Sequence, residues 1–219
     1  MKPLALPVPT NRRDADMAYD ALESLIATLA LKPGAPIVEA ELITTLGLGR
    51  TPTREALMRL VSTGLITQQP RRGLRVSDID LAEHLNLLET RRVLERLIAS
   101  MSARRATPAQ RDELLVHAQS MLTAAEKGKL ASYMLGDQAL DRVNHAACRN
   151  PSAVGAVVPL VIQCRRFWYA YQHAGDMLDG ARCHLAIAQA IASGSSKQSM
   201  QASDALLDSL RSFAQKVID

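Results

Sequence analysis

The stretch that decides the fold is LKPGAPIVEAELITTLGLGRTPTREALMRLVSTGLITQQPRRGLRV, residues 31–76. Residues 39–46 have helical spacing, and Gly47 predicts their end. Thr51–Pro52 predicts the start of the next helix, with Thr as the N-cap and Pro at the first helical position, where its missing N–H is not needed. Gly64 predicts the end of that helix. These signals predict two short helices joined by a tight turn.

After Gly64 the pattern changes from helical to extended. Two short β-prone runs, residues 65–68 and 74–77, flank the segment Gln69–Pro70–Arg71–Arg72–Gly73. Turn-forming residues between two β-prone runs are typical of a hairpin. We therefore expect a small hairpin whose tip is basic.

Outward from this stretch, the remaining signals are helical. Residues 14–31 have apolar side chains at helical spacing, and from residue 80 onward strand signals vanish. The expected later helices are 80–105, 108–127, 130–148, 152–173, 177–193 and 197–217. The fold class is thus mainly α: an N-terminal helix-turn-helix with a small β-hairpin, followed by an all-α helical bundle. The expected divisions are an extended tail at 1–13, a first domain at 14–77 and a helical domain at 80–219.

Composition shows where the charge of the chain lies. The 219 residues are 47% hydrophobic and 22% charged, values of an ordinary globular protein, with a net charge of +4. Between Arg50 and Arg75 there are six arginines and one acid, Glu55, which is a local excess of five positive charges. The rest of the chain is therefore close to neutral, and the basicity is a patch.

The basic patch falls on two elements with distinct shapes. In a helix-turn-helix the second helix enters the DNA major groove by its N-terminal end, and an adjacent basic hairpin reaches phosphates or the minor groove. Only seven aromatic residues are present, which argues against single-strand binding by base stacking. The residues expected to contact double-stranded DNA are Arg50, Thr51, Thr53 and Arg54 on the helix and Arg71, Arg72 and Gly73 on the hairpin.

Cysteine usage and hydropathy indicate the compartment. The three cysteines include no CxxC pair and cannot all pair within one chain, so we expect reduced thiols. No run of 18 apolar residues occurs, and the proline-broken start MKPLALPVP lacks the continuous apolar region of a signal peptide. The expected location is the cytoplasm, with no membrane partner.

The stretch 31–76 resembles the winged helix-turn-helix of GntR-type bacterial transcription regulators, above all in the run RTPTREAL followed by GLI and PRRG. The helical remainder resembles the FCD-type sensing domain of the FadR subfamily. It does so through LLETRRVLE (residues 87–95), ARRATP (103–108), YMLGDQALD (133–141), Asn150–Pro151 and CHLAIAQAI (183–191). The resemblance implies a homodimeric regulator, a repressor, that binds a palindromic operator and responds to a small organic acid.

The resemblance also assigns individual roles in DNA binding. Arg50 and Arg54 match arginines that meet bases or phosphates, Thr51 matches a contact at the helix start, and Gly73 matches the glycine of the wing tip. Thr53 stands where the family is more often apolar, so its contact is expected from position alone. Gly49 stands where the family usually has Ser, which removes one hydroxyl contact to the DNA backbone.

In the FadR subfamily, the helical domain often holds a divalent metal through an Asp, a His four residues later and two further His. Spacing of four places both side chains on one helix face. Here two registers are open: Asp137 with Asp141, or Asp141 with His145. His184 matches the second histidine in either register, but no histidine occurs near 206–209, where the third is expected.

The metal set is therefore incomplete, and two interpretations remain open. The residues are either polar side chains that line a pocket or the helix surface, or an altered site for a harder ion than the imidazole set would bind.

Arginines indicate how an acidic effector would be held. Arg91 matches the family's arginine on the first sensing helix and is a candidate to pair with an effector carboxylate. Arg165 or Arg166, next to four aromatic residues between Phe167 and Tyr171, is a second candidate for this role. The alternatives are a helical domain that binds no ligand and a metal-dependent helical enzyme. No nucleophile–base pair, phosphate-binding loop or dinucleotide-binding glycine motif supports catalysis, so we expect no enzymatic activity.

Overall fold

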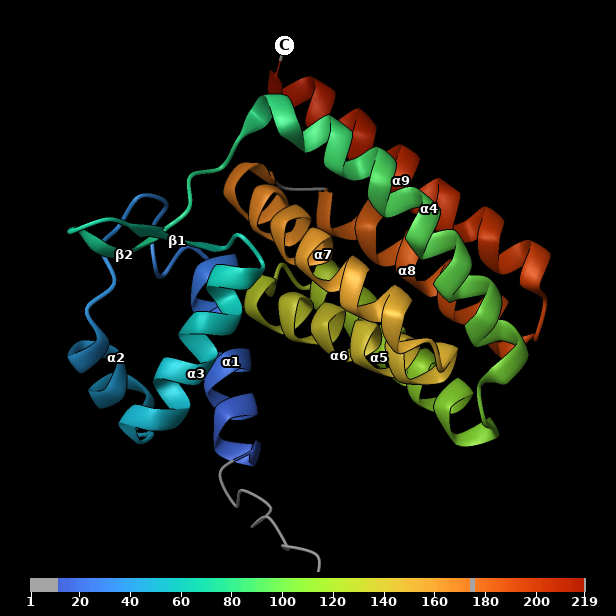
Figure 1. Cartoon of the computed structure of the whole chain (residues 1–219). Coiled ribbons are helices and arrows are strands. Elements are labelled where there is room, and N and C mark those ends of the chain that lie inside the picture. The colour runs from blue at the N-terminus through green and yellow to red at the C-terminus, as the bar shows by residue number, and fades with distance from the viewer. Residues whose placement is uncertain (1–11, 174–175, 219) are drawn as a thin grey trace, which may run out of the picture. The chain divides into compact units, whose positions relative to one another are not determined.

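The computed structural model describes residues 12–173 and 176–218, which form two compact units (Figure 1). The N-terminal unit comprises the described residues up to Ile79 together with Arg165–Ala170, and the helical unit comprises Asp80–Cys164 and the described residues from Tyr171 onward. The elements of the N-terminal unit are α1 (Arg12–Ala27), α2 (Glu39–Leu46), α3 (Arg50–Ser62), β1 (Ile66–Gln69) and β2 (Gly73–Val76).

The remaining helices confirm the mainly helical class. They are α4 (Leu81–Arg105), α5 (Pro108–Glu126), α6 (Leu130–Cys148), α7 (Pro151–Tyr171), α8 (Asp176–Ala192) and α9 (Ser196–Ile218). Their bounds lie within two residues of those expected. The predicted tail at 1–13 lies almost wholly outside the described residues, and its last two positions are helical rather than extended because α1 begins at Arg12.

In the N-terminal unit, α1 packs on α3, and the turn between α2 and α3 sets the direction of α3. Gly47 ends α2 with φ of +64°, a left-handed conformation that glycine adopts without a Cβ clash. The start of α3 differs from the expectation. Gly49, not Thr51, is the N-cap, because its extended backbone places its carbonyl to accept the first helical bond, from the N–H of Thr53.

The hairpin carries a third extended segment along its outer edge. Strands β1 and β2 pair antiparallel, with Ile66 opposite Val76 and Gln69 opposite Gly73, one residue offset from the predicted runs. Residues 34–37 run along the other edge of β2, where the N–H of Ile37 donates to the carbonyl of Leu74 at 2.8 Å. The segment that the sequence indicates as a break after the first helix thus also supports the hairpin.

The helical unit is built on long helices that pack side by side. Helix α4 packs along α9, and α5 packs against α6 and α8 (Figure 1). Thr107 caps α5 in a complete capping box with Gln110, as the Thr–Pro pair predicts. Gly136 lets α6 approach α5 closely, since a Cβ there would lie 2.6 Å from Cγ of Met121.

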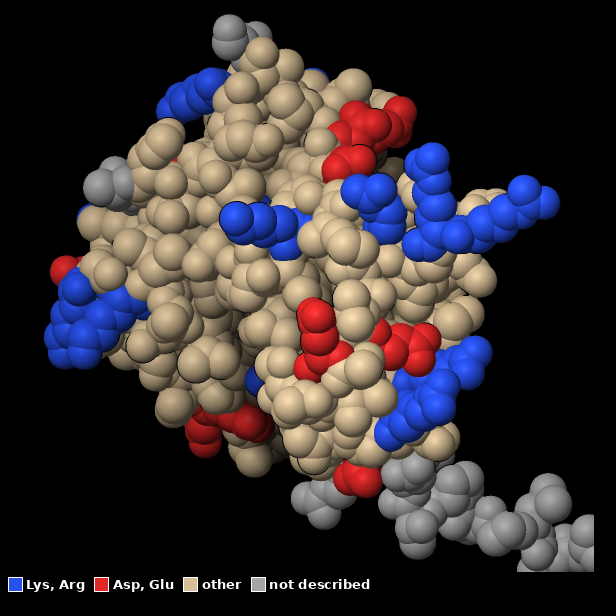
Figure 2. All heavy atoms as spheres, turned by 90° about the vertical axis from the view of Figure 1, so that its left-hand side faces the viewer, with Lys and Arg blue, Asp and Glu red and all other residues tan. Residues whose placement is uncertain are grey.

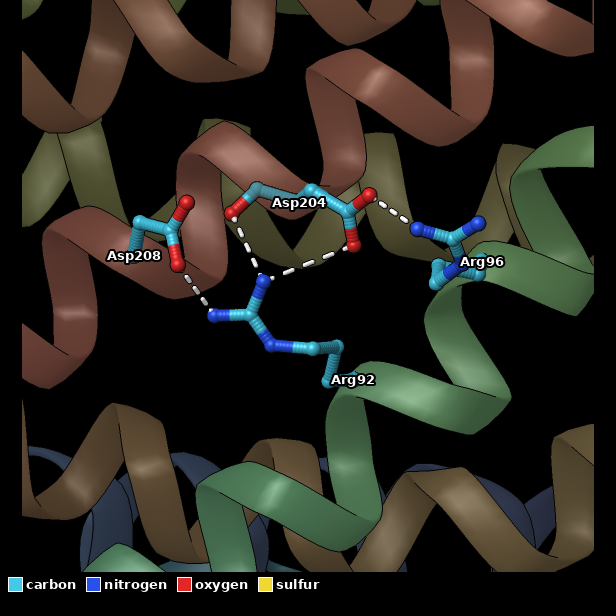
Figure 3. Close-up of polar contacts among 4 residues, drawn as sticks. All are labelled: Arg92, Arg96, Asp204 and Asp208. Carbon is cyan, nitrogen blue, oxygen red and sulfur yellow. Dashed lines mark hydrogen bonds and ion pairs between the residues drawn. The ribbon is translucent and has the colours of Figure 1, made fainter.

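Ion pairs join the first and last helices of this unit along the seam between α4 and α9 (Figure 3). Arg92 reaches Asp204 at 3.5 Å and Asp208 at 2.5 Å, and Arg96 pairs with the other oxygen of Asp204. These side chains are partly exposed, so each pair contributes less than about 1 kcal/mol to stability.

The short segment Arg165–Ala170 is grouped with the N-terminal unit, which the sequence did not indicate. Arg165 pairs with Glu23 of α1 at 3.1 Å, and Arg166, fully buried, donates to the hydroxyl of Ser77 at 2.9 Å and to its carbonyl. None of the described helices is both long and apolar enough to cross a membrane.

Candidate nucleic-acid interface and helical cavity

The first two turns of α3 present an exposed basic edge. Arg50, Thr51 and Arg54 are exposed, and with Glu55 and Met58 they line an open groove on this helix. Figure 2 shows Lys and Arg side chains projecting from several points of the face that it displays, with Asp and Glu side chains near them. Exposed arginines at the N-terminal end of a helix are suited to base edges and phosphates, because the orphan N–H groups there also favour anions.

Thr53 does not belong to this edge, and its expected DNA contact is corrected. Its side chain is 1% exposed, and its hydroxyl donates to the carbonyl of Gly49 at 2.9 Å. The side chain therefore stabilises the first turn of α3 and is withheld from solvent.

Two of the six arginines in the basic patch serve the fold. Arg59 pairs with Asp16 at 2.8 Å and lies over the ring of Tyr19, 4.2 Å from its centroid. Arg75 donates through its guanidinium to the carbonyl of Gly34. The arginines left on the exposed surface are the pair on α3 and the pair at the hairpin tip.

The hairpin tip is exposed and tightly turned. Arg71, Arg72 and Gly73 are all exposed, and the N–H of Arg72 donates to the carbonyl of Gln69 at 3.1 Å. Gly73 has φ of +79°, and Arg71 has φ of +62°, which a residue with a Cβ rarely adopts. Arg71 therefore stands at a position whose backbone conformation favours glycine.

The helical unit encloses a small polar cavity between α4, α6, α8 and α9. Its volume is about 10 Å³, enough for about one water molecule. The lining includes Arg91, Glu95, Asp141, Asn144, His184 and Leu206. Of the residues expected at a sensing pocket, Arg91, Asp141 and His184 are thus brought together.

Arg91 and Glu95 form an ion pair in the wall of this cavity. Nε and Nη2 of Arg91 each lie 3.0 Å from Oε1 of Glu95, and the two side chains are 7% and 9% exposed. Burial alone would lower the pKa of Arg91, but neighbouring acidic groups outweigh it and raise that pKa above its usual value. These groups are Cys164, Glu95 and Asp141.

His184 pairs with Asp137 at the same cavity. Its Nε2 lies 3.2 Å from Oδ1 of Asp137, and its Nδ1 lies 2.8 Å from the carbonyl of Gly180. Burial alone would lower the pKa of His184, but the hydrogen bond and charge of Asp137, together with the charge of Asp141, raise it. His184 is therefore favoured as the imidazolium, which donates from both nitrogens.

The remaining candidate metal ligands do not complete a site. His145 is not part of the cavity lining, and its Nε2 is buried without a hydrogen-bond partner among the described residues. The stretch in which the third histidine is expected begins with Leu206, which lines the cavity. Across the described residues, no group of three His, Cys, Asp or Glu side chains is placed to hold a metal ion.

The structure corrects one expected effector contact and adds two residues to the cavity. Arg165 does not line the cavity, because its guanidinium is held by Glu23 within the N-terminal unit. Glu95 and Asn144 do line it, and the side-chain oxygen of Asn144 is buried without a partner among the described residues. Spacing could have indicated both, since Glu95 follows Arg91 by four residues and Asn144 follows Asp141 by three.

Comparison with known proteins places each unit in a family. Residues 14–76 match "Bacterial regulatory proteins, gntR family", and residues 86–209 match the FCD domain. The chain is 32% identical over 101 residues to the HTH-type transcriptional regulator McbR of Escherichia coli, covering 46% of each chain. It is 30% identical over 115 residues to the HTH-type transcriptional repressor RspR of Escherichia coli, covering 52% of this chain and 50% of RspR. The chain thus spans about half the length of these relatives.

Solved structures agree with the fold. The structure of Escherichia coli McbR/YncC superposes with a TM-score of 0.80 over 94% of this chain and 99% of that one, at 18% identity. A GntR regulator from Rhodococcus sp. RHA1 superposes with a TM-score of 0.68 over 93% and 98%, at 16% identity. With the family matches covering both units, the chain belongs to the gntR family of bacterial regulatory proteins and carries an FCD domain.

Proposed function

We propose that this protein is a transcription regulator, a repressor, that binds a palindromic operator in double-stranded DNA. One observation carries the proposal: Arg50 and Arg54 are exposed one turn apart at the N-terminal end of α3, whereas Arg59 on the same helix is held by Asp16. The N-terminal end of α3, which enters the major groove in this proposal, thus carries two exposed cations. The arginine nearer the other end of the helix, Arg59, stabilises the fold instead. The exposed hairpin tip adds a second contact, to phosphates or the minor groove.

The test compares two arginines of one helix. Affinity for DNA from upstream of the protein's own gene is measured by fluorescence anisotropy over a range of salt concentrations. We expect Arg54→Ala to abolish sequence-specific binding and Arg59→Ala to leave affinity and salt dependence close to those of the wild type. Loss of a phosphate contact reduces the slope of log affinity against log salt by about 0.9. Unchanged binding by Arg54→Ala would show that α3 is not the recognition helix.

A palindromic operator requires a second copy of the chain, so the active form in this proposal is a homodimer. Val93 and Leu97 on α4 are exposed one turn apart, at 69% and 43%, and supply an apolar face for this contact. Sedimentation equilibrium of the wild type and Val93→Glu tests it, with a monomeric variant expected. The regulator works in the cytoplasm, where its DNA is, and has no catalytic activity.

The effector in this proposal is a small organic acid that also carries a hydroxyl or amino group. Arg91 is the cation able to take the carboxylate, and the unpartnered oxygen of Asn144 is an acceptor for the donor group. The cavity has room for about one water molecule, so the acid must displace Glu95 from Arg91 as it enters. Breaking the Arg91–Glu95 ion pair would change the contacts of α4, and effector binding would act on this helix in that way.

Thermal-shift measurements with matched compounds test this effector class. The probes are three- to four-carbon 2-hydroxy and 2-amino acids, each beside the acid without the donor group and the amide without the carboxylate. Binding to the folded state raises the melting temperature, so only the doubly functional acids should do so strongly. A larger shift with the amides would overturn the role of Arg91 as the carboxylate partner.

A further inference from the structure

The family resemblance implies a divalent metal in the FCD domain, and the cavity allows a test of whether the residues fit one. A protein metal site needs at least three side-chain donors with lone pairs aimed at one point. The residues nearest to this arrangement are Asp137, Asp141 and His184. They do not form such a group in the described part of the chain.

The histidine is the first reason for the misfit. Both ring nitrogens of His184 face oxygen acceptors, the carbonyl of Gly180 at 2.8 Å and the carboxylate of Asp137 at 3.2 Å. Nδ1 is thus used by the carbonyl of Gly180 and Nε2 is paired with Asp137, so His184 and Asp137 together supply at most two donors toward one point. The carboxylate of Asp137 is committed to this contact as well.

Two further residues of the cavity lining cannot act as metal ligands. Leu206, at the start of the stretch where a third histidine is expected, places an apolar side chain in the lining. On α4, the buried guanidinium of Arg91 is bonded to Glu95 and interacts electrostatically with Asp141. A fixed cation thus already compensates the two carboxylates that would otherwise draw a metal into the cavity.

We propose that this cavity does not hold the divalent metal that the resemblance implies, and that it works with the guanidinium of Arg91 as the cation in its lining. The inference rests on the proposed effector cavity, since it names the cation that an acid would meet there. A guanidinium supplies directional N–H donors and cannot lose its charge, so effector binding would not depend on metal supply or on chelators.

The test begins with the full-length protein purified without chelators and without a metal-affinity resin. Elemental analysis is expected to find no stoichiometric Zn, Mn, Ni or Fe. Thermal unfolding is expected to be unchanged by EDTA and by added ZnCl₂ or MnCl₂. Stoichiometric metal, or a melting temperature lowered by EDTA, would overturn the proposal. These readouts use no DNA, so their outcome is independent of operator binding.

A gain of metal binding supplies the second test. Arg91→Met removes the cation that Glu95 bonds, so that Glu95, Asp141 and His184, which all line the cavity, can supply three donors, and MnCl₂ should raise the melting temperature of this variant. Arg96→Met, on the same helix but partly exposed, is the matched control and should show no metal response. A folded Arg91→Met protein without a metal response would overturn the assignment of Arg91. If that variant does not fold, the measurements on the wild type decide.

Discussion

Arg91 and Glu95 lie one turn apart on α4, and their side chains meet at 3.0 Å inside the helical unit, where both are more than nine-tenths buried. A pair so buried has lost its hydration, so each charge depends on the other. Because both residues line the cavity, an effector that bound there would alter an ion pair on which the stability of the helical unit depends.

Removing one partner of this pair should be costly. We expect Arg91→Met to lower the free energy of unfolding by about 3–5 kcal/mol, because it leaves Glu95 as an uncompensated buried charge. Replacing both residues, as Arg91→Met/Glu95→Met, should recover most of this loss, since apolar side chains of similar size need no partner. Urea denaturation of the three proteins measures both effects.

The matched control is Arg96→Met, whose arginine side chain is 44% exposed and pairs with Asp204. Its loss should cost less than about 1 kcal/mol, as for other surface pairs. Equal losses of unfolding free energy in the Arg91 and Arg96 variants would mean that burial does not make the Arg91–Glu95 pair more important for stability.

The direction in which Glu95→Gln changes effector affinity should show whether the ligand competes with Glu95 for Arg91 or contacts Glu95 itself. If an acid displaces Glu95 from Arg91, neutralising Glu95 weakens the internal competitor, and the acid binds more tightly. Isothermal titration with the strongest acid from the thermal-shift panel gives the affinity of each protein. Weaker binding by the variant would indicate that Glu95 contacts the ligand directly, through a cationic or donor group.

Two threonines on α3 should separate stability from DNA binding. Thr53→Val removes the buried hydroxyl that donates to Gly49, so we expect a loss of about 0.5–1.5 kcal/mol in unfolding free energy with DNA affinity retained. Thr51→Val alters an exposed side chain, so stability should stay within about 0.5 kcal/mol while operator affinity falls. Denaturation and anisotropy on both variants make the comparison, and a reversed pattern would refute the correction made for Thr53.

His184 should make the stability of the helical unit depend on pH. Its pKa is raised in the folded state, so its stabilising contribution is complete below the ordinary value of 6.5 and is lost as the pH rises through the folded pKa. Asp137→Asn removes the main cause of the raised pKa. The difference in unfolding free energy between wild type and Asp137→Asn should therefore shrink as the pH rises above about 6.5.

A second histidine, His84 on α4, also makes stability depend on pH, so the wild type has to be compared with Asp137→Asn. Burial and the charge of Arg91 lower its pKa to about 4, so it contributes the opposite trend, a loss of stability as the pH falls from 6.5 toward 4. Both proteins keep His84, and its contribution cancels in the difference. A difference that does not vary with pH would show that His184 is not protonated by its pairing with Asp137.

The sequence by itself determined the helices, their order and the basic patch. Helix bounds follow from apolar spacing and from caps such as Thr107–Pro108 and Gly47, which act between residues a few positions apart. Position along the chain also placed Arg50 and Arg54 at the N-terminal end of α3, where the structure leaves both exposed, and their contact with DNA stays a prediction.

Only the tertiary structure decided which charged side chains are exposed and which hold the fold together. Arg59 meets Asp16, Arg75 meets Gly34 and Arg165 meets Glu23, in each case a residue more than forty positions away. In the cavity, His184 of α8 pairs with Asp137 of α6 because burial makes an unpaired charge expensive, so each of these ionic groups needs a partner on a helix packed beside its own. Spacing along the chain cannot specify these partners, because they depend on how distant elements pack.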